Sequence, residues 1–469
     1  MKNFLREHYP FLILLILVLA TRFLFLSYPA EVVFDEVHFG KFVSAYFTQQ
    51  YYFDIHPPLG KLMIAGVAKL FDFQPGLSFE KIGEVANART LLGLRFLPAL
   101  FGSLFVLLIY PIVRALGGSK GAAFLGSFLI LFDNAFLVES KFILVDSFLF
   151  FFSFLSVWLF LLARKQNTFS KQIVLYILAA LASGLSFSIK WTGLSFWGII
   201  VAFIFFDLLK NFKSQEIKKT FLKLSVFIVI PLAIYLIPFV IHFNLLTHSG
   251  SGDAFMSLDF QRTLVGNNIS SGIEPLPFWN RFVELNQAMF SYSSGLKKEH
   301  PDSSRWYQWP LMKKPVWYWT HSTGSGQVAE SRSANIYLWG NPVVWSSALI
   351  GLFLGVWFLL KERKYAVSFL FLGYLANLLP FIFVGRVAFL YHYLPSLAFA
   401  VLLFAVLAGR FFDKHSSFFY LSSERLSFAY FGYLALVSIF FLVVAPLTYG
   451  FFVDPRFSSV LQFLIRLFH

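Results

Sequence analysis

The chain has 469 residues, of which 58% are hydrophobic and only 13% are charged, and its mean hydropathy is +0.70. This composition excludes an ordinary soluble globular domain and predicts an all-α polytopic membrane protein. The basic residues that give the net charge of +14 lie mainly between the apolar stretches. The charge therefore indicates membrane orientation and argues against nucleic-acid binding. Because the sequence lacks cysteine, disulfides and thiolate metal sites are excluded.

Apolar stretches long enough to cross a ~30 Å hydrocarbon core recur along the whole chain. We expect about eleven transmembrane helices within one integral membrane domain, residues 1–469. The stretches are 9–29, 95–116, 121–138, 142–163, 173–189, 192–209, 222–243, 342–360, 366–384, 388–408 and 428–453. The first is too long for the core of a signal peptide and lacks a clear cleavage site, so we expect it to be retained.

Lysine and arginine predict the orientation of these helices, because they concentrate in alternate short loops such as 210–223 and 361–364. The positive-inside rule then places the N-terminus in the cytoplasm of a multi-pass plasma-membrane protein. Two long segments, 30–92 and 244–340, fall on the outer face. We expect the active site there, because these segments hold most of the polar chemistry.

The first outer segment carries two adjacent carboxylates, Asp35 and Glu36, before an amphipathic stretch. A second such stretch runs from Leu59 to Phe71, after a Pro-Pro break. We expect two short outer-face helices that lie in the interface and hold the carboxylates near the bilayer surface. The alternative is that the two acids only cap the helix that follows them.

Around the Pro-Pro break, His56 and Lys61 are expected to shape the first loop, although His56 also fits a simple turn residue. By ligand type, Asp35, Glu36, His38 and His56 would suit a divalent metal. We favour a site without metal, because carboxylate-rich outer loops usually serve other roles. No Asp-X-Asp motif or glycine-rich nucleotide loop is visible in the sequence.

A second polar group lies where the third and fourth predicted helices meet on the outer side. It consists of Asp133, Glu139, Lys141 and Asp146. Ionisable residues at membrane depth are costly unless they face a cavity or a partner, so we expect this group to frame a cavity between helices. The alternative is structural, with Lys141 neutralising Asp133 or Asp146.

Three cations, Arg95, Lys190 and Arg386, stand at the outer ends of different predicted helices. Together they could converge on one anion such as a phosphate. Taken singly, each fits an ordinary snorkelling residue. The large segment 244–340 is rich in Ser, Gly, Trp and Tyr, which favours a lid or binding platform, with an interfacial aromatic belt as the alternative.

Ordered motifs between about residues 22 and 397 carry a family resemblance. They are FDEVHFGKF, DIHPPLGK, LRFLPALFGSL, LFDNAFLVESKFILVDSFL, IKWTGL, HSGSGDAFMSLDFQ, HPDSSRWYQWPLMKKPVWYW, WGNPVVW and NLLPFIFVGRVAFLYHYLPSL. In this order they make the chain similar to the protein O-mannosyltransferases, which have the GT-C membrane fold. The resemblance implies transfer of mannose from a polyprenyl-phosphate-mannose lipid to Ser or Thr hydroxyls of extracytoplasmic proteins.

The resemblance also implies residue roles. Asp35 would be the general base on the acceptor hydroxyl, with Glu36 orienting or assisting it. The cations that would bind the donor phosphate are Arg95 first, then Lys190, Arg386 and His392. A single displacement would invert the anomeric centre and give an α-mannosyl product from a β-linked donor. No tightly bound cofactor is implied.

One departure from the eukaryotic relatives is clear. Residues 261–267 lead within about ten residues to Pro277, so the soluble β-trefoil insertion of those enzymes has no room here. The chain therefore resembles a prokaryotic-type member, and its oligomeric state stays open.

Two rival functions remain. A related GT-C transferase could move aminoarabinose or another sugar to lipid A or a glycan. A transporter could line a permeation path with buried charges, but the sequence has no convincing internal repeat. Under the preferred interpretation the partners are the sugar lipid, acceptor protein segments and membrane lipids.

Overall fold

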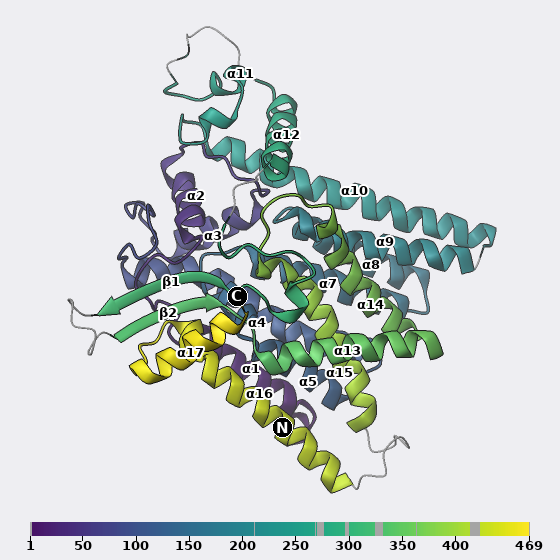
Figure 1. Ribbon diagram of the computed structural model, residues 1–469. Helices are drawn as coiled ribbons and strands as arrows, with labels where there is room; N and C mark the ends of the chain where they lie inside the picture. The colour runs from purple at the N-terminus through teal and green to yellow at the C-terminus, as the bar shows by residue number, and fades with distance from the viewer. Residues whose placement is uncertain are drawn as a thin grey trace.

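The computed structural model describes residues 2–210, 212–267, 269, 276–295, 300–323, 332–362, 364–412 and 423–468. The part up to residue 245 is helical: α1 (Lys2–Phe23), α2 (Glu36–Thr48), α3 (Leu59–Leu70), α4 (Ala88–Ala115), α5 (Lys120–Leu131), α6 (Asn134–Lys141), α7 (Asp146–Arg164), α8 (Phe169–Phe187), α9 (Leu194–Lys210) and α10 (Ser214–Leu245). The rest comprises α11 (Leu258–Gln261), α12 (Phe278–Gly295), β1 (Val316–Thr323), β2 (Arg332–Leu338), α13 (Pro342–Lys361), α14 (Tyr365–Leu378), α15 (Leu394–Phe412), α16 (Ser423–Tyr449) and α17 (Pro455–Phe468). Figure 1 shows their arrangement.

Every one of the eleven predicted apolar stretches contains a helix. Within the described residues, nine helices are long and apolar enough to cross a membrane, and α5 with α6 would make a tenth, bent by 61°. The apolar part of α1, Tyr9–Phe23, is shorter. A multi-pass helical membrane protein is therefore confirmed, whereas eleven crossings remain a prediction.

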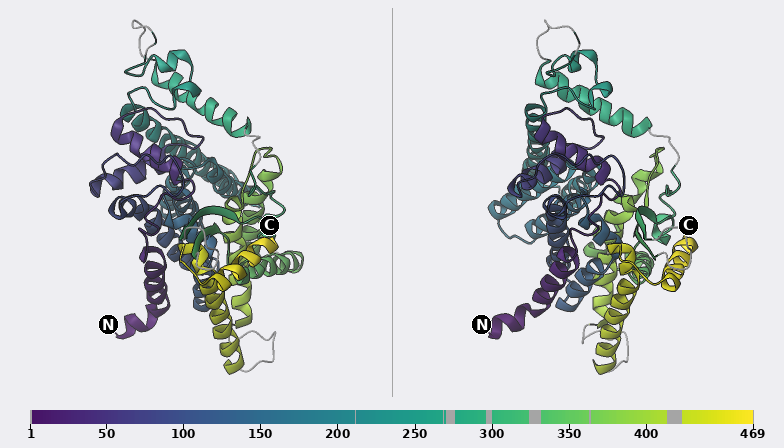
Figure 2. Two further views of the ribbon diagram at one scale, coloured as in Figure 1. Left: turned by 60° about the vertical axis from the view of Figure 1, so that its left-hand side comes forward. Right: turned by 90° about the vertical axis from the view of Figure 1, so that its left-hand side faces the viewer.

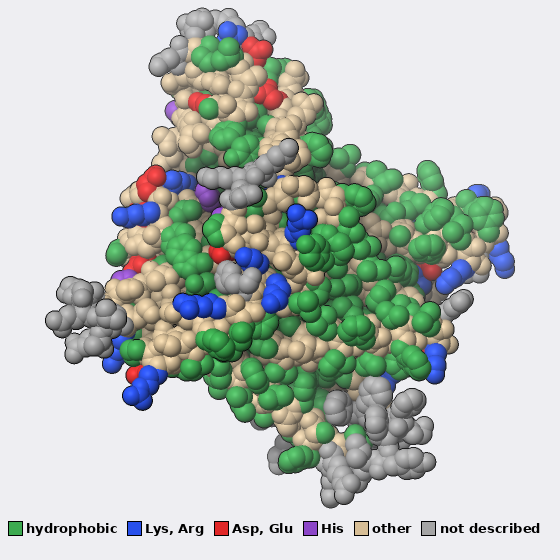
Figure 3. All heavy atoms as spheres, in the orientation of Figure 1, with side chains coloured by type: hydrophobic (Ala, Val, Ile, Leu, Met, Phe, Trp, Pro, Cys, Tyr) green, Lys and Arg blue, Asp and Glu red, His purple; other side chains and the backbone are tan. Residues whose placement is uncertain are grey.

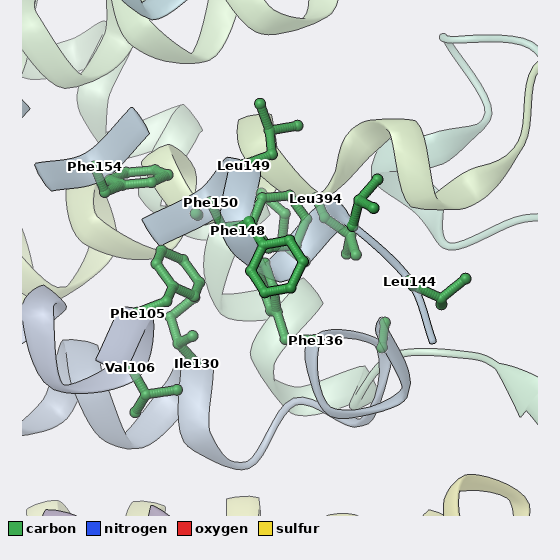
Figure 4. Close-up of a cluster of buried hydrophobic side chains, with 14 of the residues drawn as sticks. Phe105, Val106, Ile130, Phe136, Leu144, Phe148, Leu149, Phe150, Phe154 and Leu394 are labelled. Carbon is green, nitrogen blue, oxygen red and sulfur yellow. The ribbon is translucent and has the colours of Figure 1, made fainter. Parts of the chain in front are cut away.

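Aromatic side chains fill the centre of the helical bundle. Phe105 of α4 lies 5.6 Å from Phe136 of α6 and 5.2 Å from Phe154 of α7, measured between ring centroids (Figure 4). Gly102 lets α4 approach α6 closely, because a Cβ at this position would come within 2.2 Å of the Ser140 side chain. Tight van der Waals packing of this kind stabilises helix association in membranes, where apolar burial alone contributes little.

The two long segments predicted on the outer face lie together at one end of the bundle. Tyr51 donates its backbone N–H to the His248 carbonyl at 2.8 Å, and His248 donates to Gln49 at 3.0 Å. The two short helices expected in the first segment are present as α2 and α3, and α11 and α12 extend beyond the end of α10 (Figures 1 and 2). Their position relative to a bilayer remains a prediction.

The mostly helical fold, as predicted, also contains a two-stranded antiparallel sheet, β1 with β2. Its strands contain Val, Ile, Trp, Tyr and Thr, residue types that favour strands, but the composition of this segment had favoured a lid or binding platform, with a membrane belt as the alternative. Phe34, beside Asp35, donates its backbone N–H to the Tyr318 carbonyl of β1 at 3.0 Å. The hairpin, with α17 packed on β2, therefore reaches the first loop.

Candidate active site

A cavity of about 1000 Å³ lies where the segments 30–92 and 244–340 meet the ends of α7, α9 and α15. Seven of the twelve predicted site residues line it: Asp35, His56, Glu139, Asp146, Lys190, Arg386 and His392. These residues are far apart in the sequence, and the fold brings them to one chamber. The other five are Glu36, Lys61, Arg95, Asp133 and Lys141, which do not line it.

Asp35 presents an unpaired carboxylate to this cavity, since it forms no hydrogen bond or ion pair with any described residue. It precedes α2 directly and follows Phe34, whose ring stacks on Tyr318 with centroids 3.9 Å apart. Phe34 has a φ of +45°, an unusual value for a bulky residue, and the stacking holds it there. Burial raises the pKa of Asp35, while the nearby His38 and Lys190 side chains oppose that rise. A carboxylate with a raised pKa is suited to accept a proton.

Glu36 and Arg95 form a fully buried bidentate ion pair away from the cavity. Arg95 donates from Nε and Nη2 to the two carboxylate oxygens, each at 2.8 Å. Glu36 also accepts from the backbone N–H groups of Val33 and Ile143. The remaining Arg95 donors bond to backbone carbonyls of the first loop, at Leu26, Pro29 and Glu31.

This geometry corrects the expectation for Arg95. Its guanidinium is occupied by Glu36 and loop carbonyls, so it has no donors left for a donor phosphate. Glu36 likewise has both oxygens bonded and cannot exchange a proton with substrate. The pair instead anchors the loop that presents Asp35, and the separation of 59 residues hid it from sequence inspection.

Two cations line the cavity, one in an ion pair and one without a partner among the described residues. Lys190 donates to Asp146 at 2.6 Å and lies 5.8 Å from the Tyr391 ring centroid. Arg386 forms no hydrogen bond or ion pair within the described part of the chain. Burial lowers the pKa of its guanidinium below the usual value for arginine. Its N–H donors are therefore free to bind an anion. His392 is held by the Phe389 backbone, at 3.1 to 3.2 Å from Nδ1.

Lys61 supports the turn that carries His56. Its Nζ donates to Asp54 and to the carbonyls of His56, at 2.8 Å, and Pro57, at 3.1 Å. The His56 ring faces the cavity, and burial together with Lys190, Lys61 and other cations lowers its pKa well below the usual value. His56 is therefore a neutral hydrogen-bonding group at pH 7.

Asp133 and Lys141 do not frame the cavity, contrary to expectation. Asp133 caps α6 and accepts from the Asn341 backbone and the Trp345 indole, both at 2.9 Å. Lys141 donates to the Tyr28 carbonyl at 2.9 Å and lies 4.7 Å from the Tyr449 ring centroid. Lys141 thus neutralises neither Asp133 nor Asp146, which pairs with Lys190. Asp133 and Lys141 are therefore structural groups, and each has its own hydrogen-bond partners.

Sequence inspection missed Tyr318, which joins the hairpin to the cavity. Its Oη donates to Oε1 of Glu139 at 2.6 Å, and its side chain is fully buried. The alternation of apolar and polar residues in 332–338 could have indicated a strand, but nothing in the sequence pairs Tyr318 with Glu139. His300, Asn377 and Tyr391 also line the cavity without having been singled out as site residues.

Replacing Tyr318 by phenylalanine should destabilise the fold by about 1–3 kcal/mol, because the buried Glu139 carboxylate loses its donor. Thermal unfolding of the purified protein in detergent measures the effect. Tyr307→Phe is the control, since Tyr307 is 54% exposed. Equal unfolding temperatures for the two variants would mean that the Tyr318 hydroxyl contributes nothing to stability.

The described residues contain no group of three or more side chains of His, Asp or Glu placed to hold a metal ion. Among the four ligand candidates from the sequence, Glu36 is bound to Arg95. These four residues therefore do not form a metal site in this geometry.

Comparison with known proteins identifies the family. The family model described as dolichyl-phosphate-mannose-protein mannosyltransferase matches residues 12–247, and that of the C-terminal four-helix membrane region of protein O-mannosyltransferase matches residues 278–462. Dolichyl-phosphate-mannose–protein mannosyltransferase 4 of Candida albicans is 34% identical over 298 residues, covering 61% of this chain and 40% of that protein. Mannosyltransferase 1 of Saccharomyces cerevisiae is 37% identical over 257 residues, covering 53% and 31%. The chain thus spans well under half the length of these relatives.

Solved structures agree on the fold. The S. cerevisiae protein O-mannosyltransferase Pmt1–Pmt2 complex bound to the sugar donor superimposes with a TM-score of 0.87 at 21% identity, covering 97% of this chain and 92% of that one. ArnT from Cupriavidus metallidurans gives a TM-score of 0.52 at 14% identity, covering 97% and 69%. Both likenesses support the GT-C architecture. From the two family matches, which together span most of its length, this chain belongs to the protein O-mannosyltransferase family.

Proposed function

We propose that this protein transfers mannose from a polyprenyl-phosphate-mannose lipid to Ser or Thr hydroxyls of proteins on the extracytoplasmic side of the plasma membrane. The observation that carries the proposal is a cavity that holds the Asp35 carboxylate and the Arg386 guanidinium, both without a side-chain partner in the described part of the chain. Family membership supplies the donor and acceptor classes.

In the proposed reaction, the acceptor oxygen attacks the anomeric carbon opposite the departing phosphate, and the configuration inverts. Asp35 takes the hydroxyl proton as the new carbon–oxygen bond forms. The bond from the anomeric carbon to the phosphate oxygen breaks, and the electron pair leaves with the lipid phosphate. A phosphate needs no proton to leave, so one catalytic carboxylate is enough.

Cations at the cavity stabilise the leaving phosphate in this scheme. Arg386 offers unoccupied guanidinium donors, which suit bidentate phosphate binding. Lys190 can contribute while it remains paired with Asp146, and His56 and His392 supply neutral hydrogen-bonding groups nearby. We assign Arg386 the leading role that the sequence had suggested for Arg95.

The proposal is tested with purified wild-type protein in detergent, radiolabelled polyprenyl-phosphate mannose and a Ser/Thr-rich peptide. Labelled peptide is the expected product, and its release by α-mannosidase would report the stereochemistry. Failure of folded protein to label the peptide, together with transfer of aminoarabinose to lipid A, would replace the proposal with the rival transferase.

Replacing Arg386 by glutamine should lower kcat/KM for the donor by about 10- to 100-fold, because a charged hydrogen bond to phosphate is lost. The KM for the acceptor peptide should stay unchanged. Arg305→Gln is the matched control, since Arg305 is exposed in the large outer loop and does not line the cavity. A similar loss in both variants would argue against phosphate binding by Arg386.

A further inference from the structure

A second polar cavity, of about 330 Å³, lies at the opposite ends of α7 to α10 from the candidate active site. Asp146 begins α7 at the active-site end, and Lys190 lies a few residues before the start of α9. Arg164 and Lys210 mark the far ends of the same helices and line the second cavity. A helix of 19 residues is about 28 Å long, so the two cavities lie at opposite ends of helices that are long enough to cross a membrane.

The second cavity carries an excess of positive charge. Arg164 pairs with Asp207, and Lys219 pairs with Glu216. Two further lysines in its lining, Lys210 and Lys223, take part in no ion pair with any described residue. Figure 3 shows blue side chains gathered at the right-hand end of the molecule, where Figure 1 places the ends of α9 and α10.

A threonine in the wall offers a further polar group to the cavity. Thr220 is only 5% exposed, lines the cavity and has no side-chain hydrogen bond to any described residue. A threonine hydroxyl in a helix can bond to a carbonyl of the preceding turn, and here it forms no such bond within the described part of the chain, so it can donate to a ligand in the cavity. Lys223, one turn further along α10, lies over the Tyr176 ring at 5.2 Å, which fixes its direction.

Apolar side chains cover the outside of the same helix ends. Phe205, Phe206 and Leu209 of α9 are each about half exposed, and Phe221 of α10 is 73% exposed. In a membrane these side chains would contact lipid acyl chains next to the cavity mouth. A ligand with a charged head and apolar chains fits this combination of surfaces.

We propose that this cavity binds the phosphate group of an anionic glycerophospholipid, with Lys210, Lys223 and Thr220 as its ligands. Basic pockets between membrane helices on the positively charged side are suited to lipid head groups. The positive-inside rule places this end in the cytoplasmic leaflet. The proposal is independent of the transferase reaction, because lipid binding is measured without mannose transfer.

Native mass spectrometry in neutral detergent, with phosphatidylglycerol titrated onto the full chain, tests the site. Lys223→Gln should weaken binding by about tenfold, because a charge-assisted hydrogen bond is lost. Lys210→Gln, at an exposed position that tolerates change, and the near-isosteric Thr220→Val should each weaken it less. Lys120→Gln is the matched control, since Lys120 begins α5 at the same end of the bundle but does not line the cavity.

Selective loss of phosphatidylglycerol binding in the cavity variants, with phosphatidylcholine binding weakly throughout, would support the proposal. Equal affinity of wild type, Lys210→Gln and Lys223→Gln for phosphatidylglycerol would overturn the site. Displacement of the lipid by inorganic phosphate at an equal concentration would make free phosphate the ligand and overturn the lipid assignment.

Discussion

Replacing Asp35 by asparagine should reduce mannose transfer by about 10²- to 10⁴-fold, the usual contribution of a general base. Asparagine has nearly the same shape but cannot accept the hydroxyl proton. Radiolabelled transfer to a Ser/Thr-rich peptide, compared at equal amounts of folded protein, measures the loss. The KM for the donor should change little, since Asp35 acts on the acceptor.

Asp72→Asn is the matched control for this variant. Asp72 lies in the same segment, 30–92, is exposed and does not line the cavity, and its φ of +55° suits asparagine. It should retain wild-type activity. Wild-type activity in Asp35→Asn would remove Asp35 as the base while leaving the family assignment intact.

The raised pKa of Asp35 has consequences for pH dependence. Activity should be present above this pKa and fall as pH decreases through it, with an inflection above the ordinary value of 3.8. For stability the sign is opposite. The folded state holds the proton more tightly than the unfolded chain, so Asp35 costs stability as pH rises above 3.8. Asp35→Asn should therefore unfold at the same temperature as wild type or higher at pH 7.

Breaking the pair of Glu36 and Arg95 should be the largest change in stability. Arg95→Met leaves the Glu36 carboxylate buried without its cation, which should cost about 3–5 kcal/mol. Thermal unfolding in detergent and the yield of monodisperse protein report this effect. Glu36→Gln should also destabilise the fold, because Arg95 then keeps its buried charge without a carboxylate.

The exposed pair of Lys41 and Glu80 provides the comparison. Their side chains are 41% and 70% exposed, and Glu80→Gln should change stability by less than about 1 kcal/mol.

Arg95→Lys separates the two roles considered for Arg95. An anchoring arginine predicts lower stability with an unchanged donor KM in the molecules that fold. A raised donor KM at wild-type stability would return Arg95 to phosphate binding.

Much of the architecture follows from local sequence properties. Runs of apolar residues specify membrane helices, because a backbone in lipid must satisfy its own hydrogen bonds. The Pro-Pro break separates α2 from α3, as expected from the missing N–H and restricted φ of proline. The β1–β2 hairpin was not predicted, since its aromatic residues fit an interfacial belt equally well.

The sequence by itself determined a helical membrane protein of the protein O-mannosyltransferase family and singled out Asp35 in the segment predicted to be its first outer loop. Only the tertiary structure decided which charged residues face the cavity. Glu36 and Arg95 bond to each other, and Asp133 caps a helix, whereas Arg386 has no hydrogen-bond or ion-pair partner among the described residues. The physical reason is that a charged side chain can bind a ligand only when the fold leaves it unpaired at a cavity. Whether it is paired depends on residues that are distant in the sequence.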